Sequence, residues 1–269
     1  MTFIKELFRH IKEDEPFGMA AQCAYYFLLS FFPFLLFLVS LLGYLPVTTQ
    51  SVLELARQYI PKGVEPGVRE QLQHIFEVRR GGALSFGILF TLVSSSTALN
   101  AIVLNVNKAY GLPARKSFIH SQLLAIGLTM ALLLVVVFVL LFSVFGQTIG
   151  DWLFQWHFLS GDQVSLWNGL RWVVAFVVLF LVFTGVYFVA PNTCLTCKDV
   201  LPGALFAALG WQVASFGFSF YVSHWGRYNV TYGSLAGIIV LLVWFYISAL
   251  LILIGGEINA ITYGRRKNA

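Results

Sequence analysis

Uncharged polar side chains recur at helical spacing within long apolar stretches of this 269-residue chain. Residues three, four or seven positions apart share one face of a helix. Such a face either hydrogen-bonds neighbouring helices together or lines a path for a polar molecule, and both interpretations stay open. The candidate pathway residues are Gln22, Tyr26, Ser30, Pro33, Ser96, Asn100, Asn107, Gln212, Ser215, Ser219, Asn229, Thr231 and Tyr232.

One acidic residue stands apart from this uncharged set. Glu257 is the only acid after Asp199 and follows the apolar run "LLILIGG". A carboxylate there either anchors the helix end, by reaching the headgroup region or by pairing with Arg265 or Arg266, or faces the helix bundle as a gating or proton-binding group.

Residues for enzyme chemistry are not arranged in a recognisable motif. The chain has neither HExxH nor GxSxG, and its five histidines are scattered along the sequence. Cys194 and Cys197 form a CxxC pair, but zinc needs four ligands and no second pair completes the set. Two incidental thiols are the favoured interpretation, with a redox pair as the alternative. We therefore expect no catalytic residues, no metal and no cofactor.

The composition indicates that these side chains lie within a membrane. Hydrophobic residues make up 58% of the chain and charged residues 11%, against roughly 25% charged in a soluble domain. Stretches without Asp, Glu, Lys or Arg each exceed the roughly 20 residues that a helix needs to cross a bilayer. There are six of them, at 16–53, 81–107, 117–150, 172–197, 200–226 and 228–256.

The apolar stretches predict helices because they are continuous, whereas barrel strands are short and alternate in polarity. The expected fold is an all-α integral membrane protein with six transmembrane helices. Residues 1–15 predict an amphipathic surface helix, and 16–263 the membrane domain. Within that domain, residues 48–80 predict an amphipathic helical insert on the outer face. After the domain, residues 264–269 form a basic cytoplasmic tail.

The distribution of Lys and Arg sets the expected orientation. With both termini cytoplasmic, the inner segments carry ten basic residues and the outer segments seven. Five of those seven lie in 48–80, beside acidic residues. The formal charge of +5 is therefore an orientation signal, and we expect no nucleic-acid partner. The sequence leaves the oligomeric state open.

Four stretches carry a resemblance to a known family. They are "AAQCAYYFLLSFFPFLLF", "SSSTALNAIVLNVNKAYG", "LPGALFAALGWQVASFGFSFYVS" and "YNVTYGSLAGIIVLLVWFYISALLILIGGEINA". Over nearly its whole length the chain resembles the YihY/BrkB family of bacterial inner-membrane proteins. The resemblance implies a six-span inner-membrane protein, described as a transporter and tied to the cell envelope or lipid handling. Some members carry the label ribonuclease BN, for which this sequence offers no nuclease chemistry.

Two functions follow as hypotheses. In the first, the polar faces meet around an uncharged cavity that moves a lipid-like or amphiphilic substrate. Ion-coupled carriers commonly use charged residues inside the membrane, and in this sequence none lies clearly at mid-depth. Membrane lipids are then the partners. In the second, the protein is a non-transporting scaffold for envelope assembly, and the insert 48–80 binds an envelope protein.

Overall fold

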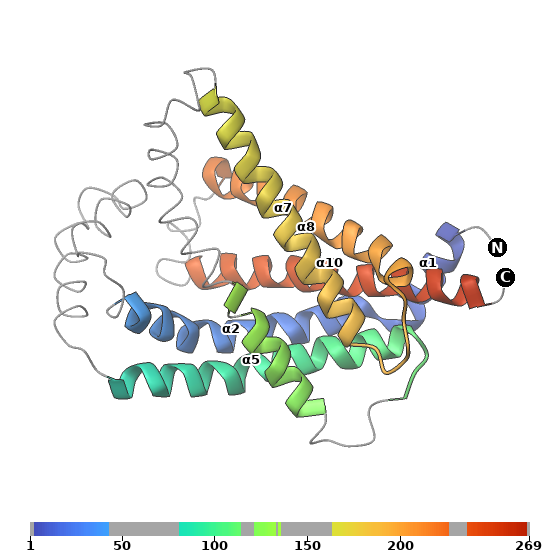
Figure 1. Ribbon diagram of the computed structural model, residues 1–269, viewed down its shortest axis with the longest axis horizontal. Coiled ribbons are helices and arrows are strands. Elements are labelled where there is room, and N and C mark those ends of the chain that lie inside the picture. The colour runs from blue at the N-terminus through green and yellow to red at the C-terminus, as the bar shows by residue number, and fades with distance from the viewer. Residues whose placement is uncertain are drawn as a thin grey trace. The chain divides into compact units, whose positions relative to one another are not determined.

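The computed structural model describes residues 3–42, 81–113, 121–132, 134–135, 163–225 and 236–267. This described part is helical, with no strand, so the all-α prediction is confirmed for it. In chain order the helices are α1 (Phe3–Asp14), α2 (Pro16–Leu42), α5 (Gly81–Ala109), Ser121–Leu132, α7 (Gln163–Val189), α8 (Cys197–Trp225) and α10 (Ala236–Lys267), as Figure 1 shows.

Several helices extend beyond the charge-free stretches of the sequence. Helix α8 includes Lys198 and Asp199 in its first turns, and α10 continues through Glu257 to Lys267. Helix α7 begins at Gln163, so it contains Arg171, which the charge pattern placed in a connection. Backbone hydrogen bonding does not stop where the side chains become charged. The charge-free stretch therefore marks the part suited to hydrocarbon, and not the helix ends.

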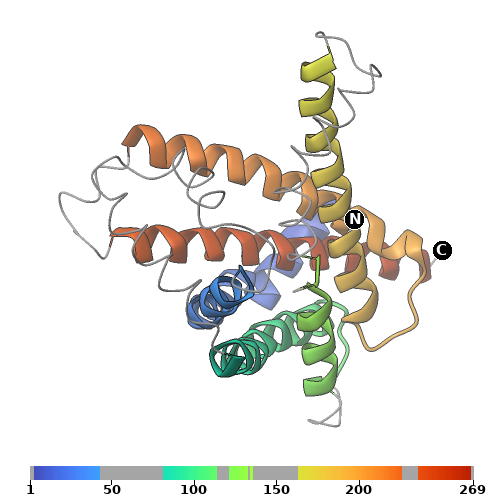
Figure 2. The same cartoon turned by 60° about the vertical axis from the view of Figure 1, so that its left-hand side comes forward.

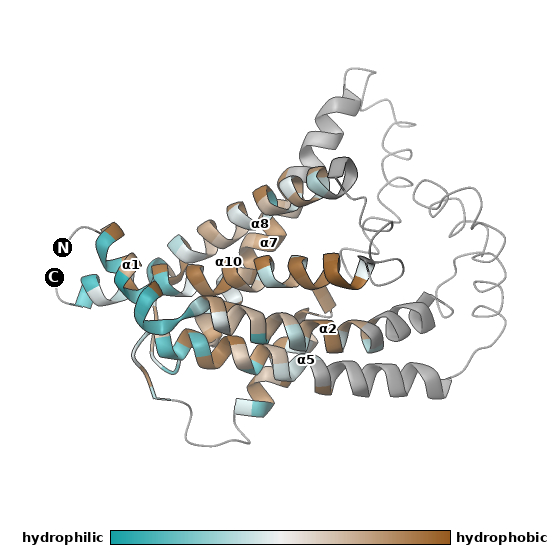
Figure 3. Ribbon diagram, turned by 180° about the vertical axis from the view of Figure 1, so that it is seen from behind, coloured by the Kyte–Doolittle hydropathy of each residue, from teal (hydrophilic) through white to brown (hydrophobic). Residues whose placement is uncertain are grey.

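Two described helices are long and apolar enough to cross a bilayer, Cys197–Tyr221 and Gly237–Lys267. In the most apolar 18 residues of each helix, only 28% and 11% are buried, whereas a core helix of a soluble fold is mostly buried. Val213 and Phe216 on α8 are each 73% exposed. Apolar faces this open are typical of helices that contact lipid or another protein. Figure 3 shows the apolar length of α10 and the hydrophilic residues of α1 and of the end of α10.

The chain forms two compact units. One is Phe27–Ser95, whose described part is the second portion of α2 and the first portion of α5. The other joins Met1–Tyr26 to Ser96–Ala269. Within this larger unit α8 packs against both α7 and α10, and α1 packs against α10 (Figures 1 and 2).

Helices α8 and α10 approach most closely at two glycines. A Cβ added to Gly203 would lie 2.0 Å from the carbonyl oxygen of Gly255. The backbone N–H of Gly203 donates a 2.7 Å hydrogen bond to Oδ1 of Asn259 across this contact. The hydroxyl of Tyr187 adds a 2.6 Å bond from α7 to the carbonyl of Ile252. Small residues allow the backbones to meet, and polar bonds fix the crossing.

Specific local structures define the start of α8, the end of α5 and the junction between α1 and α2. Asp199 Oδ2 accepts bonds of 2.8 Å from both the backbone N–H and the hydroxyl of Thr196, and the first of these is one half of a capping box at the start of α8. Gly111, with φ of 63°, closes α5 in the left-handed conformation that glycine tolerates. Between α1 and α2, Glu15 adopts φ of 54°, and Pro16 opens α2.

Candidate functional site

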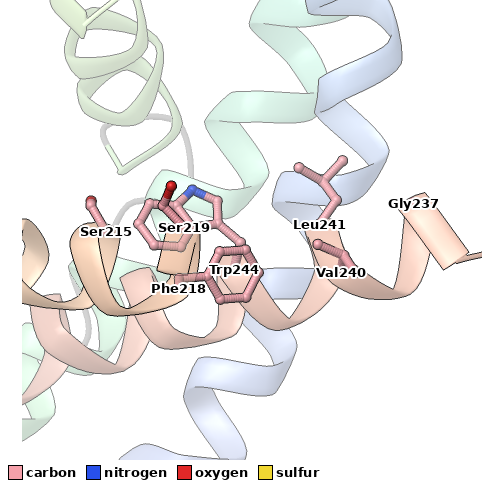
Figure 4. A pocket seen from close by; sticks show the side chains of 7 residues that line it. All are labelled: Ser215, Phe218, Ser219, Gly237, Val240, Leu241 and Trp244. Carbon is pink, nitrogen blue, oxygen red and sulfur yellow. The ribbon is translucent and has the colours of Figure 1, made fainter. Parts of the chain in front are cut away.

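A groove of about 340 Å³ lies between α8 and α10. Figure 4 shows the side chains that line it. Its volume is at the lower end of ligand-binding pockets, which are about 300–1,000 Å³. We call it the α8–α10 groove. Its lining residues are Ser215, Phe218 and Ser219 from α8, and Gly237, Val240, Leu241 and Trp244 from α10.

The groove combines an apolar wall with two hydroxyl groups. The rings of Phe218 and Trp244 contact each other with centroids 5.2 Å apart. Ser215 and Ser219, four residues apart, add their side chains on the α8 side. The hydroxyl oxygen of Ser215 is buried and has no hydrogen-bond partner in the described part of the chain. An apolar chain with a hydrogen-bonding group fits such a lining.

Three other candidate pathway residues take part in bonds between chain segments. Gln122 donates a 3.0 Å hydrogen bond from its amide to the hydroxyl of Ser96. Ser121 donates a 2.6 Å bond to Oδ1 of Asn100. Both bonds tie α5 to the helix Ser121–Leu132. The third residue, Asn107, is 2% exposed and connects α5 to the segment that follows α7.

Asn107 uses both ends of its side-chain amide. Its Nδ2 donates to the carbonyls of Val103, at 2.7 Å, and Ala190, at 3.0 Å. Its Oδ1 accepts a 2.7 Å bond from the backbone N–H of Asn192. These bonds satisfy backbone groups at the end of α7, which is the packing alternative that the sequence left open.

The remaining candidates lie in several places. On α2, Gln22 is exposed and Tyr26 is half-buried, with its ring 5.6 Å from that of Tyr25. Further along, Ser30 donates a 2.9 Å bond to a carbonyl of its own helix, and α2 continues through Pro33. Gln212 is half-buried on α8. Outside the described residues are Asn229, Thr231, Tyr232 and the insert 48–80.

A second group of side chains gathers where α1 meets α10. We call His10, Asp14, Lys108 and Glu257 the helix-end cluster. Nδ1 of His10 lies 3.1 Å from Oε2 of Glu257 and 4.0 Å from Oδ2 of Asp14. The ammonium of Lys108 lies 3.7 Å from Oδ1 of Asp14 and donates a 3.0 Å bond to the Asp14 carbonyl. The Glu257 side chain is only 5% exposed.

The arginines at the end of α10 pair with residues other than Glu257. Arg265 donates to Oε2 of Glu6 at 2.7 Å, and this hydrogen bond holds the pKa of the Glu6 carboxyl below its usual range. Arg266 lies 2.9 Å from Oδ2 of Asp199 and also bonds Thr196. Of the alternatives for Glu257, pairing with an arginine is therefore not observed in the part of the chain that the structure describes, and its Oε2 lies in hydrogen-bond contact with His10. Both arginines lie eight or more residues beyond Glu257, and α1 lies nearer.

Some residues of the α8–α10 groove and of the helix-end cluster were not predicted from the sequence. Phe218 and Trp244 belonged to apolar runs with no mark that sets them apart. His10 and Asp14 are four residues apart on the predicted surface helix, a spacing that places them on one face, yet nothing in the pattern showed that this face meets Glu257. The groove and the helix-end cluster are also distinct. Gly237 and Glu257 are twenty residues apart on α10, about 30 Å along a helix.

Comparison with known proteins agrees with the membrane character of these helices. The family described as "Virulence factor BrkB" matches residues 7–269. The ribonuclease-like protein YfkH of Bacillus subtilis is 44% identical over 267 residues, covering 99% of this chain and 97% of that protein. A UPF0761 membrane protein of Tolumonas auensis is 30% identical over 257 residues, covering 94% of this chain and 82% of that protein. One from Vibrio campbellii is 29% identical, covering 97% and 82%.

No solved structure matches the chain. The family match spans all of the helices described above except the first residues of α1. The similarity to membrane proteins fits the exposed apolar faces of α8 and α10. The resemblance drawn from the sequence motifs is therefore confirmed, and the chain belongs to the BrkB family of membrane proteins.

Proposed function

We propose that this membrane protein is a transporter or translocation factor for a lipid-like or amphiphilic molecule, and that the α8–α10 groove holds the apolar part of that molecule. In this proposal the chain crosses the bacterial inner membrane six times and both termini are cytoplasmic. The observation that carries the proposal is the groove itself, which is apolar on most of its surface and contains the buried Ser215 hydroxyl, which has no hydrogen-bond partner among the described residues.

The chemistry of the lining selects the class of substrate. Side chains of Phe218, Val240, Leu241 and Trp244 offer hydrocarbon and aromatic surface, which is suited to an acyl chain. The hydroxyl of Ser215 can donate to an ester or headgroup oxygen, and the gain is larger because a buried polar group without a partner is costly. Among the described residues, the lining includes no charged side chain, whereas ions and strongly charged solutes usually require one inside a membrane.

The groove also opens towards the surroundings of the helices. On α10, Val243 is exposed and lies next to the lining residue Trp244 in the chain. On α8, Phe216 and Phe220 are exposed and flank the lining residues Phe218 and Ser219. In a bilayer these side chains contact lipid. A lipid tail can therefore enter from the side without crossing a charged barrier, while its headgroup stays at the interface.

A glycine pair provides the test. Gly237 lines the groove, and a Cβ built there meets no described atom within 4 Å, so Gly237→Leu places a side chain in the groove without a clash with the described backbone. Gly217 on α8 is equally open but is not a lining residue, so Gly217→Leu is the matched control. Both variants are reconstituted into vesicles that contain a fluorescent phospholipid, and its movement between leaflets is measured.

We expect Gly237→Leu to reduce lipid movement towards the rate of protein-free vesicles, and Gly217→Leu to retain the wild-type rate. Correct insertion of both variants is checked by thermal unfolding in detergent. Equal rates for Gly237→Leu and the wild-type protein would refute the groove as the substrate path. A wild-type protein that moves no lipid at all would refute translocation of this class of substrate.

A further inference from the structure

We propose that His10, Asp14 and Glu257 form a binding site for a divalent transition-metal ion, which fastens α1 to α10. The site is separate from the α8–α10 groove, and the proposal does not depend on transport. It also revises the expectation from the sequence, which considered zinc only at Cys194 and Cys197. The three residues come from two helices and are joined only by folding.

The first argument is the spacing of the donor atoms. Nitrogen and oxygen ligands lie about 2.0–2.2 Å from Zn²⁺, so two ligands on one ion are about 3.4 Å apart at the tetrahedral angle that Zn²⁺ prefers and about 3.0 Å apart at a right angle. The measured separations from His10 Nδ1 are 3.1 Å to Glu257 and 4.0 Å to Asp14. All three donor atoms lie within 4.8 Å of one another. Small side-chain rotations towards a shared centre complete the set.

The second argument is how the site is held. His10 and Asp14 are four residues apart on α1, so both side chains project from one face. Lys108 fixes the end of this helix by its bond to the Asp14 carbonyl. Glu257 is almost fully buried, while the side chains of His10 and Asp14 are 22% and 18% exposed. One ligand is thus held in the protein interior and two lie on the side from which an ion enters.

The third argument is charge. Two carboxylates lie close together in a largely buried place, and each repels the other. Lys108 supplies one positive charge, which leaves the cluster with a net charge of −1 when both carboxyl groups are ionised and His10 is neutral. A divalent cation supplies the missing charge and uses the imidazole as a ligand. One imidazole with two carboxylates suits Zn²⁺, Mn²⁺ or Fe²⁺ better than Mg²⁺ or Ca²⁺, which favour oxygen ligands alone.

A competing explanation is that the cluster needs no ion. In that case a protonated His10 bridges Glu257 directly and Lys108 neutralises Asp14. This arrangement accounts for the same distances, so only ion binding separates the two explanations. The exposed thiols of Cys194 and Cys197 could also take up zinc, and they have to be removed before the measurement.

The experiment uses the full chain in detergent micelles with Cys194→Ser and Cys197→Ser, stripped of ions with EDTA. ZnCl2 and, separately, MnCl2 are titrated by calorimetry, and thermal unfolding is recorded with and without each salt. The ligand variants are His10→Ala and Asp14→Asn, which lie on α1 and disturb the interior less than a change at Glu257. The matched control is Glu13→Gln, an exposed carboxyl on the same helix.

We expect one ion per chain and a higher unfolding temperature with the ion bound. His10→Ala and Asp14→Asn should each weaken binding at least about 10-fold, because losing a ligand costs no less than losing a group that only orients one. Glu13→Gln should bind like the parent protein. The proposal is overturned if neither salt binds saturably to the chain without Cys194 and Cys197, or if binding is unchanged in His10→Ala and Asp14→Asn.

Discussion

The close crossing of α8 and α10 makes Gly203→Ala a sharp test of the structure. The new Cβ would lie 2.0 Å from the Gly255 carbonyl oxygen and 2.6 Å from the Asn259 side chain. Real Cβ contacts essentially never fall below 3.0 Å, so the backbones have to separate by about 1 Å. The Gly255 oxygen belongs to a helix backbone and cannot rotate away, unlike the tip of a side chain.

The cost follows from three contributions. Overpacking costs about 1–3 kcal/mol, and a clash with backbone belongs at the upper end. Loss of the bond between Gly203 and Asn259 adds about 1 kcal/mol. Alanine in place of glycine returns about 1 kcal/mol of helix propensity. The net destabilisation is about 3 kcal/mol, which corresponds to a fall of about 6–12 °C in unfolding temperature for a protein of this size.

The assay is thermal unfolding of the purified protein in detergent at one fixed scan rate, because unfolding of such proteins is often irreversible. Gly217→Ala is the matched control on the same helix, since a Cβ there meets nothing within 4 Å. It should raise the unfolding temperature through helix propensity alone. If Gly203→Ala were as stable as Gly217→Ala, the two helices could not cross at this glycine.

Two further predictions concern polar contacts. Asn107→Leu should destabilise the protein by about 2–4 kcal/mol, because it leaves the Ala190 carbonyl and the Asn192 N–H without their partner. Asn105→Leu should be neutral or stabilising in the thermal unfolding assay, because the Asn105 Nδ2 is buried and has no partner among the described residues. A comparable loss of stability in Asn107→Leu and Asn105→Leu would contradict the role given to the Asn107 bonds. The Glu6–Arg265 pair should weaken on acidification, because the pKa of Glu6 is lowered in the folded protein. The stability that this pair contributes is fully present above the ordinary carboxyl pKa, and it is lost as the pH falls through the lowered pKa of Glu6. Limited proteolysis of α1 in wild-type protein and in Glu6→Gln measures this, and an equal acid response in both would exclude Glu6 as the cause.

The helices were predictable from the sequence because lipid tolerates few charges. Each described helix other than α1 overlaps a charge-free stretch, and α1 follows the amphipathic pattern of the first fifteen residues. Their ends were not predictable in the same way. Asp199 caps α8 from within its first turn, and Glu257 lies inside α10, because a charged side chain with a partner does not interrupt a helix. The number of membrane crossings stays a prediction.

The candidate site was predictable only where one helix carries the signal. Ser215 and Ser219 share a face by spacing alone, and both line the groove. Asn107 shows the opposite case, since its partners Ala190 and Asn192 are more than eighty residues away and no local pattern predicts them. The same holds for His10 and Glu257, which are 247 positions apart. Spacing shows which side chains share a face, but not what that face meets.

The tight crossing at Gly203 also has a mechanical consequence. Two helices that cross tightly at one point can tilt about that point, provided that the contacts further along, such as the Trp211–Ser248 bond and the Phe218–Trp244 ring contact, rearrange. Ser219 is sixteen residues beyond Gly203, about 24 Å along α8. A change of only about 10° in the crossing angle therefore shifts Ser219 by about 4 Å over that lever arm, while the contact between Gly203 and Gly255 is hardly disturbed.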